Sequence, residues 1–477
     1  MSRSDQKISD SKEQLRTGIW LGVPDRLIPF WKDGANVIFT ARGVRKMPGW
    51  TAPFTKPATR VARGMHQFNN LGTLTIIWGD DFRLRQWDSV STSTIGNITS
   101  HNISETATTI ASTWSIENFG TTLVATNGVE APKIKLASDP SFLTLSDADF
   151  STCEIFLRRG PHLMALNTSI NDKGFVWSSA DDLTSWTPSS ANSAGDLVIR
   201  ELNSPIICAV PLGDRTAVYG KDQMFLINYV GAPNYFGYKP AVEGIGAVSK
   251  KAVIPVGAKN YGCGRMGFWV TDGVSSRLID DPQIHEFLQD DINWSQSSKI
   301  NGWHDEDHHM VVWYYPSAGG AGEVDKGVGF DYINSIWTTF DFGRTSSVDR
   351  DVFAYPIATT ATGEVYFHNF GDDADGVAFT ASIQSTSFDL DHPDHIKSLR
   401  NVRLDWTGTG MEWRIGLQSD LDDAITWTGW VAAPTGFIQS DVRLSARYMS
   451  LEFRSEGIGD TWELSGITTY GRLGGTR

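Results

Sequence analysis

TLTIIWG (73–79) is the first of a series of short apolar runs that decide the fold class of this chain. Each run is rich in β-branched or aromatic side chains and ends at Gly, Asn, Asp or Pro, which is the pattern of a strand followed by a turn. The other runs are TTLVATNG (121–128), HLMALN (162–167), RTAVYG (215–220), MGFWVTDG (266–273), HMVVWYY (309–315) and GEVYFHN (363–369). Aromatic strands separated by frequent turns predict an all-β protein.

The spacing of these runs indicates a repeated structural unit. Successive runs lie mostly ~40–50 residues apart, which is the length of one four-stranded blade of a β-propeller. Partner strands such as FRLRQWDS (82–89) and QMFLINYV (223–230) lie between them. If residues 50–375 are blade material, this period gives about six or seven blades. We therefore expect a β-propeller over residues 50–375.

The two ends of the chain differ from this middle region. Residues 1–49 are first polar and then extended, with Pro and Gly at intervals, which predicts an N-terminal arm that packs on the body of the protein. Beyond residue 375, segments such as RNVRLDW and RYMSLEFR alternate apolar and charged positions, as strands with one buried face do. This pattern predicts a C-terminal β-sandwich-like domain over residues 376–477. A short helix is expected only around DPQIHEFLQDDI (281–292).

Composition excludes several classes of function. The 477 residues contain 41 Lys and Arg against 55 Asp and Glu, a net charge of −14. This balance argues against a chain whose main role is to hold nucleic acid through its phosphates. The three cysteines are far apart, which disfavours a disulfide framework and a thiolate zinc site and fits a reducing cytosol. Neither a secretory signal nor a membrane anchor is expected.

The richest ionisable cluster is WHDEDHHM (303–310). Its histidines and carboxylates could ligate a divalent metal. However, the string lies between NGW and the strand MVVWYY, where a hairpin turn belongs, and neighbouring histidines on a strand point to opposite faces. We interpret the cluster as a solvated turn, with a metal site as the alternative. Its ionisable residues are His304, Asp305, Glu306, Asp307, His308 and His309.

Four other acidic strings fit turn chemistry better than ligand binding. GDDADG (371–376) fails as a calcium loop, because it lacks an acidic first ligand and a Glu at position 12. DLDHPDH (389–395) is explained by the same Asx and Gly turns. SADDLTSW (179–186) and DLDDAITW (420–427) resemble the Asp-box of sialidase-type propellers but lack its central Gly. No nucleophile motif or phosphate loop is present, so we expect neither enzymatic activity nor a cofactor.

ARGVRK (41–46) is the notable basic cluster of the chain, with Arg42, Arg45 and Lys46. An acidic surface of a partner protein and the phosphate backbone of passing DNA both fit such a cluster. A solvated arm is the commoner explanation of a short charge run. These three residues are the candidate contacts for a partner or for DNA.

Several segments together resemble one protein family. NVIFTARGVRKMPGW (36–50) resembles the entry segment of tail hub and nozzle proteins of short-tailed phages, in which a strand precedes a basic turn and a Pro-Gly. KPAVEGIGAVSKKAVIPVGAKNYGCGRMGFWVTDGVSSRLID (239–280) is similar to the same family in its G-I-G-x-V-S pattern, aromatic strand and D-G turn. The likeness covers most of residues 36–477 in order and scale. It points to the P22-like packaged DNA stabilisation, or hub, family.

The resemblance implies a structural virion protein with no catalytic residues and no cofactor. It implies a homohexameric ring below the portal and adaptor, which extends the DNA channel, helps to retain the packaged genome and passes double-stranded DNA during ejection. Needle, fibre or tailspike proteins would be further partners. The ring would be assembled in the host cytoplasm and would reside in the virion tail. The alternatives are a glycan-binding or glycan-cleaving propeller acting as a receptor-binding tail component, and a monomeric cellular scaffold.

Overall fold

The architecture was determined from a computed structural model of the chain. The structure describes residues 6–10, 14–23, 28–54, 60–80, 83–88, 96–100, 113–139, 141–390, 392–434 and 439–476. Most of the regular structure in these residues is β-strand. The all-β prediction is therefore confirmed.

Seven four-stranded antiparallel sheets follow one another along the described part of the chain. In six of them the strands pair in chain order, each with the next, as the short turns between them require. The strands of these six sheets are β6 (Ala62–Asn70), β7 (Thr73–Asp80), β8 (Arg83–Asp88) and β9 (Gly96–Ser100); β10 (Ser115–Phe119), β11 (Thr122–Thr126), β12 (Lys133–Lys135) and β13 (Leu143–Thr144); β14 (Cys153–Arg159), β15 (His162–Thr168), β16 (Gly174–Trp177) and β17 (Gly195–Val198); β18 (Cys208–Leu212), β19 (Arg215–Tyr219), β20 (Gln223–Gly231) and β21 (Tyr235–Glu243); β22 (Val253–Val256), β23 (Lys259–Gly264), β24 (Gly267–Thr271) and β25 (Ser276–Leu278); and β26 (Asn301–Asp305), β27 (Met310–Pro316), β28 (Val324–Asp331) and β29 (Ile336–Phe340).

The seventh sheet combines strands from two distant parts of the sequence. Strands β30 (Ser346–Val348), β31 (Ile357–Thr359) and β32 (Val365–His368) pair in order, and the fourth strand is β5 (Trp50–Thr51). In this pairing His368 lies opposite Trp50. A strand from the beginning of the chain thus completes the last sheet of the series.

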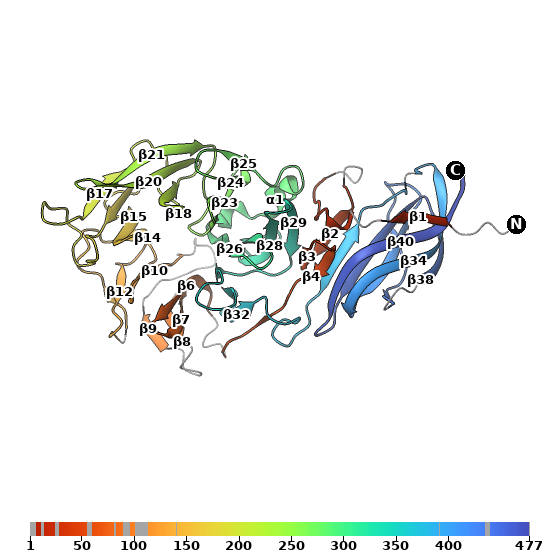
Figure 1. Cartoon of the computed structure of the whole chain (residues 1–477), viewed down its shortest axis with the longest axis horizontal. Helices are drawn as coiled ribbons and strands as arrows, with labels where there is room; N and C mark the ends of the chain where they lie inside the picture. The colour runs from red at the N-terminus through yellow and green to blue at the C-terminus, as the bar shows by residue number, and fades with distance from the viewer. Residues whose placement is uncertain are drawn as a thin grey trace.

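The first strands of the seven sheets lie side by side in a closed cycle. Strand β6 contacts β10, and the contacts continue through β14, β18, β22, β26 and β30 back to β6. Figure 1 shows the sheets arranged around a common centre. We call residues 50–368, which contain these sheets, the ring body.

Glycine marks the hairpin after the first strand in five of these sheets. The glycines have φ values between 58° and 96°, and a Cβ added to any of them would meet no atom within 4 Å. The left-handed backbone of the turn, rather than lack of space, therefore favours glycine. These residues are Gly72, Gly120, Gly160, Gly213 and Gly257.

Large apolar side chains fill the spaces between neighbouring sheets of the ring body. One cluster joins the first two sheets through Phe68, Ile77, Trp114 and Leu123. Strand β27 is buried along its whole length, as expected for a strand that is covered on both faces. Burial between sheets, rather than within one sheet, therefore stabilises each repeat.

A second body is formed by two six-stranded sheets that share one hydrophobic core. Alternating burial along β35 shows that its sheet has one buried face. We call this unit the two-sheet body. Its first sheet contains β1 (Gln6–Asp10), β3 (Val37–Phe39), β4 (Val44–Lys46), β34 (His395–Thr409), β38 (Gln439–Ala446) and β40 (Thr461–Thr476). Its second sheet contains β2 (Trp31–Ala35), β33 (Ala381–Ser385), β35 (Glu412–Gln418), β36 (Thr426–Trp427), β37 (Val431–Ala432) and β39 (Tyr448–Ser455).

The segment predicted to be an N-terminal arm supplies strands to both of these sheets. Strand β2 pairs with β33, and β4 pairs with β40. Trp31 and Val37 are fully buried in the shared core, so apolar burial holds this segment in the two-sheet body. Residues 1–5, 11–13 and 24–27 of the predicted arm lie outside the described residues, as does residue 391 of the predicted turn at 389–395.

Helix α1 (His285–Asp291) lies where the sequence predicts a short helix. Leu288 is fully buried and packs with Ile284 and Ile292 in the core between the fifth and sixth sheets. Two 3-10 helices, η1 (Gln14–Arg16) and η3 (Trp294–Lys299), complete the described helical structure. None of the helices in the described ranges is long and apolar enough to cross a membrane.

The two bodies meet where β2 and β3 contact β29, to the right of the ring body in Figure 1. The amide of Asn36 donates to the carbonyl of Thr339 (2.9 Å), and the amide of Ile19 donates to the carbonyl of Trp337 (3.0 Å). Since these bonds join backbone to backbone, they fix the two bodies to each other independently of side-chain charge.

Candidate functional site at the junction of the two bodies

The basic cluster predicted as a partner or DNA contact lies on the hairpin of β3 and β4. Arg42 is exposed at the tip of this hairpin. Lys46 is buried, and its Nζ donates to the carbonyl oxygens of Asp372 and Asp460, at 2.9 Å each. Burial lowers the pKa of Lys46. Two of its hydrogen bonds are therefore made within the chain, whereas Arg42 stays accessible to another molecule.

Arg45, the third member of the basic cluster, contacts the histidine-rich turn. Its Nη2 lies 2.9 Å from Nε2 of His308, and Nδ1 of His308 lies 2.7 Å from Oδ2 of Asp305. Nδ2 of Asn369 donates to the other oxygen of Asp305 at 3.0 Å. The two ionisable clusters that the sequence singles out are thus in contact with each other across the junction.

The histidine-rich turn lies between β26 and β27, where a hairpin is predicted. Arg350 forms ion pairs with Glu306 (2.7 Å) and Asp307 (2.5 Å). Nε2 of His304 lies 3.1 Å from the hydroxyl of Tyr332. Among the described residues, no group of three or more His, Cys, Asp or Glu side chains is placed to hold a metal ion. The carboxylates of this turn are thus met by groups of the same chain, Glu306 and Asp307 by Arg350 and Asp305 by His308 and Asn369.

Carboxylates in the other acidic strings cap turns. Oδ1 of Asp182 accepts hydrogen bonds from the amide (2.9 Å) and the hydroxyl (2.6 Å) of Thr184, and Trp186 is buried. Oδ1 of Asp373 accepts a hydrogen bond from the amide of Gly376 (2.7 Å). These contacts are the turn chemistry that the sequence predicts for both strings.

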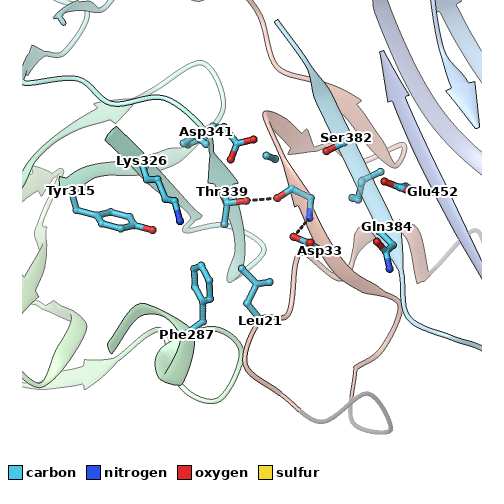
Figure 2. A pocket seen from close by; sticks show the side chains of 15 residues that line it. Leu21, Asp33, Phe287, Tyr315, Lys326, Thr339, Asp341, Ser382, Gln384 and Glu452 are labelled. Carbon is cyan, nitrogen blue, oxygen red and sulfur yellow. Dashed lines mark hydrogen bonds between the residues drawn. The ribbon is translucent and has the colours of Figure 1, made fainter. Parts of the chain in front are cut away.

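A groove of about 320 Å³ lies between the two bodies, and Figure 2 shows the side chains that line it. One wall is formed by residues of α1 and of β27–β29, and the other by residues of β2, β33 and β39. Leu21 and Phe287 give the groove an apolar part. Its polar lining includes Asp33, Tyr315, Lys326, Asp341, Gln384 and Glu452.

Two carboxylates of this groove carry like charge on opposite bodies. Desolvation raises the pKa of both Asp33 and Asp341, and the charge of Asp33 raises the pKa of Asp341 further. Lys326 lowers the pKa of Asp341, but its Nζ is bonded to the carboxylate of Asp291 at 2.9 and 3.0 Å. Desolvation therefore disfavours the ionised forms of both carboxylates, and for Asp341 the charge of Asp33 acts in the same direction.

A second cavity, of about 480 Å³, lies among the first strands of the seven sheets. Burial raises the pKa of Asp349 in this cavity to about 6, and it lowers the pKa values of Lys251 and His66. Oδ1 of Asp349 accepts a hydrogen bond from the amide of His304 at 2.7 Å. Burial thus favours the uncharged forms of all three groups in the centre of the ring body.

Sequence reasoning missed the ionisable groups of the groove and the central cavity. Asp33 and Asp341 lie about three hundred positions apart in the sequence, and Asp349 and Lys251 belong to no recognisable motif. A usable signal was the position of Lys251 and Asp349 beside the short strands that recur along the ring body, because those strand ends converge at its centre.

Comparison with known proteins gives no family. No protein-family model matches the chain, and no curated protein matches it. Among solved structures, the computationally designed Ika8 protein is similar over 74% of this chain and 99% of its own, with 10% sequence identity and a TM-score of 0.39. A likeness of this size supports no statement about fold or function.

Proposed function

We propose that the protein is a structural subunit of a phage tail hub or nozzle, which assembles into a ring below the portal and adaptor. The observation that carries this proposal is the way in which residues 31–51 join the two bodies. Strands β2, β3 and β4 belong to the two-sheet body, and β5 completes the last sheet of the ring body. A subunit that retains packaged DNA needs two bodies that do not move against each other, and one short segment with strands in both bodies restricts such movement.

The ring body is proposed to be a seven-bladed β-propeller, and the two-sheet body a β-sandwich. The cyclic contacts between first strands and the completion of the seventh sheet by β5 favour a closed propeller over an open array of sheets. A closed ring leaves only short sheet edges, which limits uncontrolled strand addition between copies.

Contacts to neighbouring subunits would use the exposed apolar side chains of the ring body. Leu71 is 84% exposed and Val274 is 80% exposed, and each lies at a turn between strands. Arg42 is the basic contact that the hairpin of the two-sheet body presents to a partner or to DNA. The net charge of −14 favours a channel along which DNA slides with little adhesion.

The experiment that tests this proposal is the mass of the purified protein in solution, with negative-stain images, alone and with a portal–adaptor assembly. A ring of about six copies with a central hole, formed alone or on the adaptor, is the expected result. A monomer that ignores the adaptor and binds or trims a polysaccharide would reject the hub and favour the glycan-active alternative.

One observation favours that alternative. On the two-sheet body, the guanidinium of Arg414 lies 4.5 Å from the ring centroid of Trp427 and 4.4 Å from that of Trp430. Arg454 lies 4.1 Å from the centroid of Trp430. Partly exposed tryptophans next to charged groups are a common surface for sugars. A glycan array with the wild type and W430A tests this second candidate.

A further inference from the structure

A series of side-chain contacts from Asp305 through His308 to Arg45 connects the two bodies. His308 belongs to the β26–β27 turn of the ring body, and Arg45 belongs to β4 of the two-sheet body. Both side chains of the His308–Asp305 pair are largely buried, with 13% and 3% of their surface exposed. The contact is therefore shielded from competing water.

Hydrogen-bond chemistry defines the protonation state of this imidazole. A guanidinium only donates hydrogen bonds, so Nε2 of His308, 2.9 Å from Nη2 of Arg45, must accept. An ionised carboxylate only accepts, so Nδ1 of His308, 2.7 Å from Asp305, must carry the hydrogen. The contact between the bodies thus requires neutral His308 in its Nδ1–H form.

We propose that His308 is a proton-controlled latch between the ring body and the two-sheet body. A proton taken from solvent onto Nε2 removes the acceptor of Arg45 and places two cations face to face. The bond from Nδ1 to Asp305 survives, because the carboxylate still accepts it. Acid therefore separates β4 from the β26–β27 turn while the turn keeps its own shape, and it releases the Arg45 guanidinium.

The acidic groups next to His308 have other partners. Glu306 and Asp307 are paired with Arg350, and the second oxygen of Asp305 is bonded to Asn369. The titratable and charged groups around His308 are His304, Asp305, Glu306, Asp307 and His309 of its own hairpin, Arg45 and Lys46 of β4, Glu463 opposite Arg45 on β40, Asp331 and Tyr332 at the end of β28, and Asp349 and Arg350 after β30.

Two other contacts near the junction have carbonyl acceptors and do not depend on the protonation of His308. Lys46 donates to backbone carbonyls, and the bond between Asn36 and Thr339 is backbone to backbone. Loss of the latch therefore opens the junction at the β4 end only, and the bodies stay attached elsewhere.

Two measurements on the full chain test the latch. Nitrogen-15 histidine spectra at pH 7.5, with H308Q to assign the signal, should show His308 as the Nδ1–H tautomer. Hydrogen exchange of the Arg45 guanidinium at pH 7.5 and 5.5, corrected for the intrinsic pH dependence, should show protection falling about tenfold or more in acid. Gln at position 308 can accept from Arg45 but does not titrate, so H308Q should stay protected at both pH values.

Two further variants complete the design. R45M removes the donor and should abolish the guanidinium signal, which assigns that signal to Arg45. H309N changes the neighbouring histidine, for which the structure gives no bond to Arg45, and it should keep the acid response of the wild type. An Nε2–H tautomer at pH 7.5, unchanged protection in acid, or an equal acid response in H308Q would each overturn the proposal.

Discussion

Completion of the seventh sheet by β5 gives the most demanding stability prediction. Trp50 is 8% exposed, and its ring centroid lies 4.7 Å from that of Phe342 and 5.1 Å from that of Phe379. The guanidinium of Arg344 lies 4.6 Å from the same centroid. W50A removes these contacts and leaves a cavity beside a buried arginine, while the backbone pairing with β32 stays.

The size of the effect follows from these contacts. Truncation of a buried Trp to Ala costs about 3–5 kcal/mol, and a desolvated cation–π contact contributes about 2 kcal/mol. Arg344 keeps Phe342 at 4.5 Å, so part of the second contribution survives. We expect W50A to lower the local stability of the seventh sheet by about 4 kcal/mol, which is roughly a thousandfold loss of amide protection.

Native-state hydrogen exchange of the β31 and β32 amides measures this loss directly. L71A is the control, because Leu71 is 84% exposed and its truncation should change protection by less than about 0.5 kcal/mol. A loss smaller than tenfold in W50A would refute the view that β5 holds the ring body closed. An equal loss in the two-sheet body would refute the local origin of the effect.

Three further predictions concern buried ionisable groups. Burial raises the pKa of Asp349 to about 6, above the value near 4 of an unfolded chain. The contribution of Asp349 to stability therefore falls as pH rises from about 4 to 7. D349N should flatten the plot of Tm against pH over that range, and an unchanged plot would contradict this prediction. Burial raises the pKa of the Cys153 and Cys208 thiols to about 12 and also raises that of Cys263. Mass spectrometry should therefore show that iodoacetamide labels none of the three thiols in the native protein and all three after denaturation. K46M removes the buried ammonium that donates to the partly buried carbonyls of Asp372 and Asp460, and it should cost about 1–2 kcal/mol in urea unfolding, whereas an exposed Lys46 would predict no change.

Local sequence pattern was enough to predict the strands of the ring body, but it did not predict which distant strands pair with each other. The apolar runs and the turn glycines lie within a few residues of each other, so sequence shows them directly. Strand β2, by contrast, pairs with β33, where Asp33 lies opposite Gln384. No local signal tells which of many short strands will meet across such a distance.

The candidate site was predicted in part, for a related reason. The sequence singles out the basic cluster that contains Arg45 and the histidine-rich cluster that contains His308. Each cluster was interpreted as facing solvent or a partner. A charge run is usually solvated, and only the packing of the two bodies brings Arg45 to His308 and buries Lys46 under Asp372 and Asp460. Asp33 and Asp341 line the same groove for the same reason.

The distant pairing of the first strands also determines when this protein can fold. Arg45 on β4 pairs with Glu463 on β40, and Gln6 on β1 pairs with Gly471. At ~5–20 residues per second, the ribosome needs on the order of 20–90 s to make the partner of β4. During that time β1 and β4 lack their pairing with β40, and unpaired strand edges attract other chains. The first strands therefore depend on β40 for their final pairing, and loss of residues 461–476 would leave β1 without its partner strand and β4 paired with β3 alone.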